Sequence, residues 1–83
     1  MNINYSDELV HALLKAKTDT EMLDLLKGLL TVGELTEISK RLKIVKLLKE
    51  GVSQREISDK LKVGIATVTR GSREIKQGRF KNI

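Results

Sequence analysis

The chain has 83 residues, of which 40% are hydrophobic, and this length fits one domain with a thin core. It contains no cysteine and one histidine, His11, so disulfides, thiolate zinc sites and cysteine nucleophiles are excluded and a multi-histidine metal site is disfavoured. The net charge of +5 is uneven: residues 1–39 carry three lysines and seven acidic residues, net −4, whereas residues 40–83 carry thirteen Lys/Arg and four acidic residues, net +9. A basic half favours a polyanionic partner, although a solvated lysine-rich face would have the same composition.

No membrane span and no secretory signal are expected. No apolar run approaches the roughly 20 residues that cross a bilayer. The first apolar residues are soon interrupted by Asp7 and Glu8, unlike the continuous apolar stretch of a signal peptide. We therefore expect a soluble, cytoplasmic protein without a membrane partner.

The hydrophobic spacing is helical from the first residues onward, because apolar residues recur every three to four positions and β-branched residues do not alternate. A first helix is expected after Ser6, which can act as its N-cap, and it should run to about Lys17. The capping-box pattern Thr18-x-x-Glu21 predicts the start of a second helix. The inward side chains of these two helices are expected to be Leu9, Val10, Leu13, Leu14, Met22, Leu25, Leu26, Leu29 and Leu30.

A second capping box, Thr31-x-x-Glu34, predicts a turn followed by the longest helix, from about Val32 to Glu50. Gly51 is expected to end this helix, since the residue that follows a helix often has a positive φ. The apolar stripe of the helix is expected to consist of Leu35, Ile38, Leu42, Val45 and Leu48.

The last third of the chain predicts two more helices. A third box, Ser53-x-x-Glu56, begins a short helix that ends near residue 61, and Lys62-Val63-Gly64 is typical of a tight turn. A final helix is expected over residues 65–76, followed by a frayed basic tail from residue 78 to 83. The fold class is therefore all-α, with about five short helices.

The two helices over residues 53–76 and their short turn fit a helix-turn-helix. Ser58 is small where the two helices must approach each other. The apolar residues expected to pack between them are Ile57, Leu61, Val63 and Val68. An ordinary helical hairpin in a bundle would show the same spacing, and the charge of +9 favours the DNA-binding alternative.

The expected DNA contacts follow from groove geometry, because a recognition helix enters the major groove with its N-terminus first. This places Ile65, Ala66 and Thr69 near base edges, with Gly64 allowing close approach of the backbone. Contacts to phosphates are expected from Gln54, Arg55 and Lys60. Further outward residues of the second helix that suit contact with DNA are Thr67, Arg70 and Arg73.

Two sequence runs resemble the tryptophan repressor family: Ser53-Gln54-Arg55-Glu56, and Gly64-Ile65-Ala66-Thr67-Val68-Thr69-Arg70-Gly71-Ser72. The resemblance covers about residues 25–76, and the N-terminal helices match in pattern only. It implies an intertwined all-α homodimer that represses transcription by binding a palindromic operator in double-stranded DNA. Residues 1–83 would then form one domain, with a dimerisation core (1–50), the helix-turn-helix (53–76) and a basic tail (77–83).

The resemblance also implies L-tryptophan as corepressor and no other cofactor. The indole would lie between two arginines, which match Arg41 and Arg70, and guanidinium planes stack well on such a ring. Thr67 matches a residue near the ligand's carboxylate, and Gly71 a residue at the indole edge. A segment that lines the pocket from the partner chain matches Leu26, Leu30 and Thr31. From the residues alone, both arginines could instead contact phosphates.

Three departures from the family pattern bear on the ligand. Glu74 stands where the family has a serine that helps to bind the amino group. The stretch from Arg41 to Ser53 is one residue shorter, which is similar to a repressor-like branch without an established ligand. The family's last helix has no counterpart in residues 77–83. The alternative to tryptophan sensing is therefore ligand-independent DNA binding.

Other classes of function fit less well. An enzyme is not expected, since Ser53, Ser58 and Ser72 have no nearby base. A helical protein–protein interaction module would explain the leucines of the N-terminal half but not the run from Gly64 to Ser72. Nonspecific nucleic-acid binding would give an affinity that falls steeply with salt and does not depend on base sequence.

Overall fold

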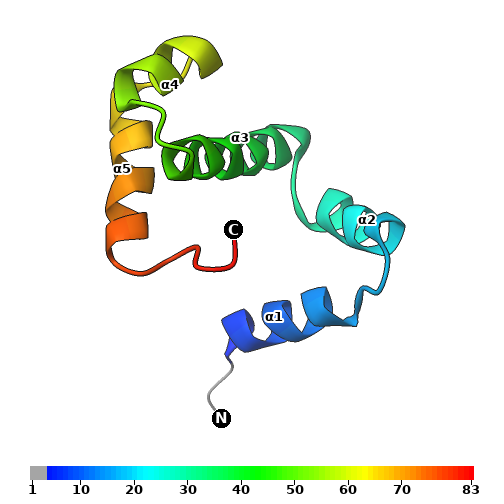
Figure 1. Ribbon diagram of the computed structural model, residues 1–83. Coiled ribbons are helices and arrows are strands. Elements are labelled where there is room, and N and C mark those ends of the chain that lie inside the picture. The colour runs from blue at the N-terminus through cyan, green and yellow to red at the C-terminus, as the bar shows by residue number, and fades with distance from the viewer. Residues whose placement is uncertain (1–3) are drawn as a thin grey trace. The chain divides into compact units, whose positions relative to one another are not determined.

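The computed structural model describes residues 4–83, which form five helices and no strand (Figure 1). The helices are α1 (Tyr5–Lys15), α2 (Asp19–Leu29), α3 (Val32–Lys49), α4 (Gln54–Leu61) and α5 (Ile65–Lys76). The predicted all-α class is confirmed. None of the helices in this part of the chain has the length and apolar character that crossing a membrane requires. The chain divides into two compact units, Met1–Leu35 and Thr36–Ile83, and each is described by itself.

In the first unit, α1 begins earlier than predicted. Its N-cap is Asn4, whose side-chain Oδ1 accepts a hydrogen bond from the amide of Asp7 at 3.0 Å. Ser6 therefore lies inside the helix, and the prediction that it caps the helix is wrong. Asn and Ser cap equally well, and the start at Asn4 adds Tyr5 and Ser6 to the helix. The helix also ends at Lys15, two residues before the predicted end.

The two capping boxes of the first unit are confirmed as helix starts. Thr18 Oγ1 accepts from the amide of Glu21 at 3.1 Å, although the Glu21 carboxylate accepts in return from Lys17 N at 2.7 Å, one residue before the cap. Thr31 and Glu34 form both halves of the box, at 3.1 and 2.8 Å. Reciprocal bonds of this kind satisfy amide groups that no helical carbonyl can reach.

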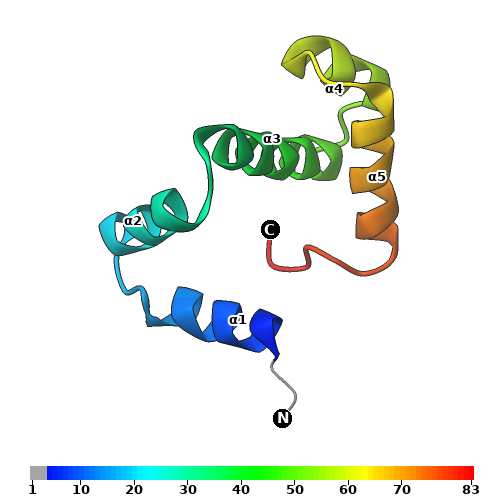
Figure 2. The same cartoon turned by 180° about the vertical axis from the view of Figure 1, so that it is seen from behind.

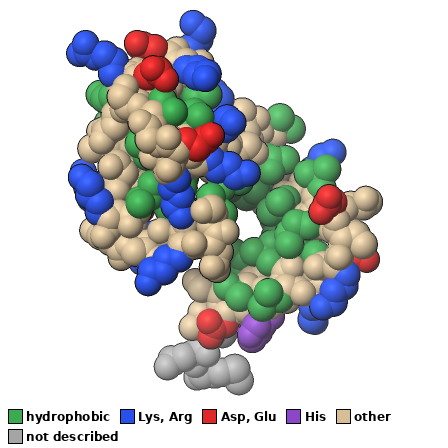
Figure 3. Space-filling model, in the orientation of Figure 1, with side chains coloured by type: hydrophobic (Ala, Val, Ile, Leu, Met, Phe, Trp, Pro, Cys, Tyr) green, Lys and Arg blue, Asp and Glu red, His purple; other side chains and the backbone are tan. Residues whose placement is uncertain are grey.

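The leucines of α1 and α2 are not enclosed within the first unit. No residue of either helix is buried, and the exposed fractions of Leu14 and Leu29 are 68% and 54%. Val32, at the start of α3, is 85% exposed. Hydrophobic side chains accordingly gather on the surface of this unit (Figure 3). An apolar surface of this extent is typical of a subunit interface.

The core of the second unit lies where the C-terminal half of α3 meets α4 and α5. Its buried residues, each at most 7% exposed, are Ile44, Leu47, Ile57 and Val68. The packing of Ile57 and Val68 with the partly buried Leu61 and Val63 was predicted and is confirmed.

The predicted apolar stripe of α3 is only partly correct. Val45 is buried and Leu48 is partly buried, but Ile38 and Leu42 are 46% and 40% exposed. Two residues outside that stripe, Ile44 and Leu47, are buried instead. The reason is that α4 and α5 cover a wide arc of the last turns of α3, whereas a single stripe assumes that one face is covered along the whole helix.

Candidate nucleic-acid interface and ligand cavity

The turn between α4 and α5 is closed by two features of the backbone and one side chain. Lys62 adopts the left-handed conformation, with φ 54° and ψ 50°. The Val63 amide donates to Ser58 O at 3.2 Å, and the Ser58 hydroxyl donates to Val63 O at 2.6 Å. Ser58 therefore ties the end of α4 to the residue before the next helix, a role beyond the small size for which the sequence singled it out.

Gly64 is the N-cap of α5 and has a φ of −65°, so its backbone conformation does not require glycine. A Cβ atom at this position would meet nothing within 4 Å. The first helical residues, Ile65 and Ala66, are exposed, and the exposed fraction of Ile65 is 51%. The N-terminal turn of α5 therefore presents small and apolar groups with open space around them, as a surface that enters a groove must.

Thr69 was predicted to lie near base edges and Gln54 to contact a phosphate, and the structure shows that the two side chains are hydrogen-bonded to each other. Thr69 Oγ1 lies 2.8 Å from Gln54 Oε1 and 3.0 Å from Ile65 O, so its single proton is shared between two acceptors. Both side chains are half-buried. Because the Gln54 oxygen accepts from Thr69, the amide NH₂ group of Gln54 is left to donate to another partner.

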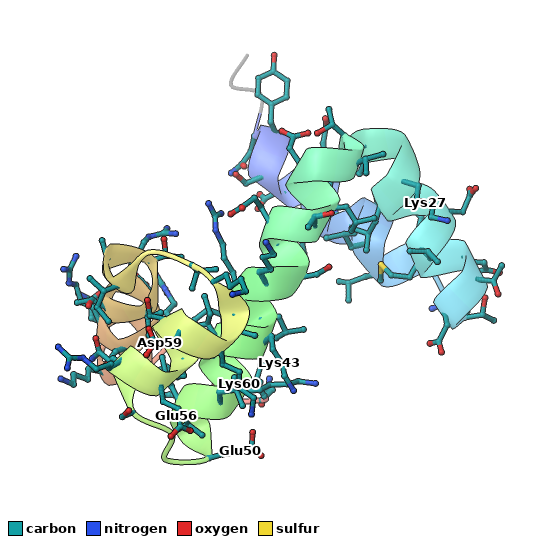
Figure 4. The ribbon with its side chains drawn as sticks, turned by 90° about the horizontal axis from the view of Figure 1, so that it is seen from above. Lys27, Lys43, Glu50, Glu56, Asp59 and Lys60 are labelled. Carbon is teal, nitrogen blue, oxygen red and sulfur yellow. The ribbon has the colours of Figure 1, made fainter. Side chains whose placement is uncertain are left out.

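The remaining predicted DNA contacts lie at the surface of α4 and α5. The exposed ones are Arg55, Lys60, Arg70 and Arg73. α4 has no net charge, because Glu56 and Asp59 balance Arg55 and Lys60 (Figure 4). The positive charge of this unit is therefore concentrated on α3, α5 and the residues that follow α5.

A cavity of about 270 Å³ lies within the second unit. Its lining comes from α3, α5 and the segment after α5: Arg41, Val45, Thr67, Arg70, Gly71, Glu74, Arg79 and Phe80. Five of these residues were expected to bind a ligand on the strength of the resemblance: Arg41, Thr67, Arg70, Gly71 and Glu74. The fold thus brings Arg41 and Arg70, which are far apart in the sequence, to the lining of one cavity.

Gly71 also lets α5 approach α3. A Cβ atom at Gly71 would lie 3.3 Å from Ile44 Cγ2 and 3.5 Å from Leu48 Cδ1. The contact with Ile44 is tighter than usual and would require its side chain to give by a few tenths of an ångström, whereas the contact with Leu48 is ordinary. Gly71, which lines the cavity, therefore lies at a close approach of α5 to α3.

Three lining residues were missed by sequence reasoning: Val45, Arg79 and Phe80. The last two belong to residues 77–83, for which the prediction of a frayed tail is wrong. Glycine at position 78 has φ 95° and Phe80 has φ 62°, so the chain turns sharply after α5. Figures 1 and 2 show this segment from opposite sides as it doubles back toward α3. The signal in the sequence was Phe80, the one phenylalanine of the chain, directly after a flexible Gly-Arg pair.

Several contacts hold this returning segment. The Arg79 amide donates to Glu74 O at 3.0 Å, and Arg79 Nε lies 3.6 Å from Glu74 Oε2. Lys49 Nζ on α3 donates to Phe80 O, and to Ile83 O at 3.0 Å. The segment is therefore attached to both helices that form the cavity.

The other residues expected at the ligand lie in the first unit. Leu26 and Leu30 are half-buried, and Thr31 uses its hydroxyl and its amide in the capping box at the start of α3. Their role toward a ligand stays a prediction.

The five helices, the closed turn between α4 and α5 and the exposed N-terminal turn of α5 place this chain in the class of all-α helix-turn-helix proteins. Within this class, the chain matches the family model described as Trp repressor protein over residues 5–82. The chain therefore belongs to the Trp repressor family, which is a family of transcriptional repressors and not of enzymes. The match also includes the N-terminal helices, where the sequence showed a likeness in pattern only.

Curated relatives with the name Trp operon repressor homolog support this membership. The one from Vibrio parahaemolyticus is 44% identical over 66 residues, which cover 77% of this chain and 64% of the relative. That from Photobacterium profundum is 45% identical over 71 residues, covering 84% and 65%. That from Vibrio vulnificus is 53% identical over 53 residues, covering 63% and 52%. The chain thus spans about half to two thirds of the length of these relatives. No solved structure matches the chain.

Proposed function

We propose that this protein is a transcriptional repressor that binds a palindromic operator in double-stranded DNA as a homodimer. The observation that carries the proposal is the exposed N-terminal turn of α5, from Gly64 to Ala66, which the turn closed by Ser58 holds clear of α4. We place this activity in the cytoplasm, where the bacteria that carry the named relatives keep their DNA.

In this proposal, α5 enters the major groove with its N-terminus first. Ile65 and Ala66 contact thymine methyl groups, because both are apolar and exposed. Arg55 and Lys60 bind phosphates and fix the position of the helix, and the free NH₂ group of Gln54 adds a third contact. Arg70 and Arg73, further along α5, contact phosphates at the groove edge. Thr69 acts by holding Gln54.

The dimer rests on a separate observation, the exposed apolar residues of the first unit. Leu14, Leu29 and Val32 are each more than half exposed. Burying such side chains against a second copy stabilises both chains, at roughly 25 cal/mol for each Å² of apolar surface. The alternative is that this surface binds a different protein, as a helical interaction module would. Light scattering distinguishes the two, because only the homodimer forms in the purified protein.

L-Tryptophan is the ligand that we propose for the cavity. Arg41 and Arg70 both line it and would stack on the indole or pair with the carboxylate. Thr67 and Gly71 would contact the carboxylate and the ring edge. The partner chain would complete the site with Leu26, Leu30 and Thr31. The second candidate is a repressor that binds DNA without a ligand, which the shortened stretch between Arg41 and Ser53 favours.

A ligand in the cavity would touch both α3 and α5 but no base. It can therefore act on DNA binding only by favouring one tilt of α5 over another. Its effect on affinity is limited by the difference in its binding to the two tilts, and the operator must strengthen ligand binding by the same factor.

Selection of bound duplexes from a random pool, with and without L-tryptophan, tests the proposal. We expect enriched palindromes whose half-sites are centred about one helical turn apart, roughly 34 Å. Enrichment only with L-tryptophan would support the corepressor, and equal enrichment in its absence would support the ligand-independent alternative. A pool that stays random, with binding that falls steeply with salt, would contradict sequence-specific recognition.

A further inference from the structure

The charges in the lining of the cavity are unequal. Among its eight residues, Glu74 is the one acidic residue, whereas Arg41, Arg70 and Arg79 are cationic. In a ligand that carries both a carboxylate and an ammonium group, the carboxylate can pair with any of several guanidinium groups. For its ammonium group, Glu74 is the one carboxylate that this lining offers.

Glu74 already has a partner. Arg79 Nε lies 3.6 Å from Glu74 Oε2, and the Arg79 amide donates to the backbone carbonyl of Glu74 at 3.0 Å. The backbone of this segment is held further by Lys49, which donates to Phe80 O. The guanidinium group of Arg79 is thus tethered beside the carboxylate by its own main chain.

The ion pair can nevertheless open without unfolding the segment. The side chain of Arg79 is 73% exposed and that of Glu74 is 32% exposed. The guanidinium group can therefore turn into water while the backbone bond from Arg79 to Glu74 stays in place. Exposed ion pairs of this kind contribute little, so a second cation can compete with Arg79.

We propose that Glu74 determines whether the cavity accepts an ammonium group, and that Arg79 competes with that ammonium group for the same carboxylate. The proposal rests on the function proposed above, in which the cavity binds an aromatic amino acid. An amino acid binds by replacing Arg79 at Glu74. An aromatic acid without the amino group binds beside Arg41 and Arg70 and leaves the pair between Glu74 and Arg79 intact.

The two residues therefore have opposite effects on the selectivity of the site. Removing the charge of Glu74 takes away the partner of the ammonium group, which lowers the affinity for the amino acid about tenfold, as for a charge-assisted hydrogen bond. Removing the charge of Arg79 takes away the competitor, which raises that affinity by up to about fivefold, the range of an exposed ion pair. Neither change alters the affinity for the acid without an amino group, apart from small effects of net charge.

The experiment measures the affinity of the full chain for L-tryptophan and for indole-3-propionate, which has the same ring and a carboxylate but no ammonium group. Because the chain has no tryptophan, the indole fluorescence of either ligand is observed without background. The variants are Glu74→Gln, Arg79→Gln and the double variant. Glu50→Gln and Lys81→Gln are matched controls for net charge, since neither residue lines the cavity.

We expect Glu74→Gln to weaken binding of L-tryptophan alone and Arg79→Gln to strengthen it alone. In the double variant, the change at Arg79 should have no further effect on L-tryptophan, because its target carboxylate is gone. Equal effects of Glu74→Gln on both ligands would overturn the proposal, as would weaker L-tryptophan binding by Arg79→Gln. If Glu74→Gln does not fold, the affinities of Arg79→Gln test the proposal, because the side chain of Arg79 is largely exposed and its replacement should not disturb folding.

Failure of the underlying function gives a different result. If neither ligand binds the wild-type chain at millimolar concentration, the cavity is not an indole site, and the proposed ligand and this inference fail together. If both ligands bind and no variant changes their ratio, the ligand site stands and the inference alone fails.

Discussion

Thr69→Val is expected to lower both the stability of the protein and its affinity for DNA, through Gln54. Valine has nearly the shape of threonine, so the change removes the hydroxyl group and little else. That hydroxyl lies 2.8 Å from Gln54 Oε1 and 3.0 Å from Ile65 O. Ile65 O can still accept from its helical amide partner, so the loss falls mainly on the Gln54 oxygen, which water can partly replace because Gln54 is only half-buried.

The expected loss of unfolding free energy is therefore that of one neutral hydrogen bond, about 1 kcal/mol. Urea unfolding of Thr69→Val, Gln54→Ala and the double variant measures it, and the coupling energy between the two positions should be of the same size. Thr69→Ser keeps the hydroxyl and should restore most of the stability.

The same variants show whether Thr69 positions Gln54 or contacts a base directly. If Thr69 acts through Gln54, Thr69→Val should weaken binding to a selected palindrome and to random duplex by similar factors, because a phosphate contact carries no sequence information. Thr69→Ser should recover binding to both. A loss confined to the palindrome would show that Thr69 reads a base directly, and a coupling energy near zero would show that the bond to Gln54 contributes nothing. Either result would refute the reasoning.

Three further changes test the turn and the interface. Ser58→Ala should lower the unfolding free energy by about 1–2 kcal/mol, because Val63 O loses the donor that closes the turn at 2.6 Å; unchanged urea unfolding would contradict this. Lys62→Gly should raise the unfolding free energy by about 0.5–1 kcal/mol, since φ is 54° there and glycine adopts this conformation without strain; a lower melting temperature would argue against the left-handed conformation. Leu14→Glu should shift the protein toward monomer in light scattering, because the side chain is 68% exposed on α1; an unchanged dimer would place the interface elsewhere.

The starts of the helices could be predicted because they depend on residues only three positions apart. In each of the boxes at Thr18, Thr31 and Ser53, the hydroxyl oxygen accepts a hydrogen bond from the amide three residues later, at 3.1–3.2 Å. The start of α1 was misplaced because Asn4 and Ser6 are equally good caps, and only the extent of the helix decides between them.

Burial and the cavity wall could be predicted only in part, because they depend on residues that are distant in sequence. The packing of Ile57 on Val68 follows from the short turn between their helices. The burial of Ile44 and Leu47 requires knowing that α4 and α5 both cover the end of α3. The place of Phe80 depends on a turn with positive φ after α5 and on a hydrogen bond from Lys49, 31 positions earlier. No local pattern reports such a bond.

The uneven distribution of burial has a consequence for the protein at low concentration. In the part of the chain that the structure describes, the buried side chains all lie between Ile44 and Val68, so the helix-turn-helix shares one core with the end of α3. In the proposed homodimer, the leucine-rich helices α1 and α2, which contain no buried residue, would be enclosed by the second chain. If the proposed dimer forms, dilution should leave slow amide hydrogen exchange in the helix-turn-helix and the end of α3, while α1 and α2 lose protection as the chains dissociate.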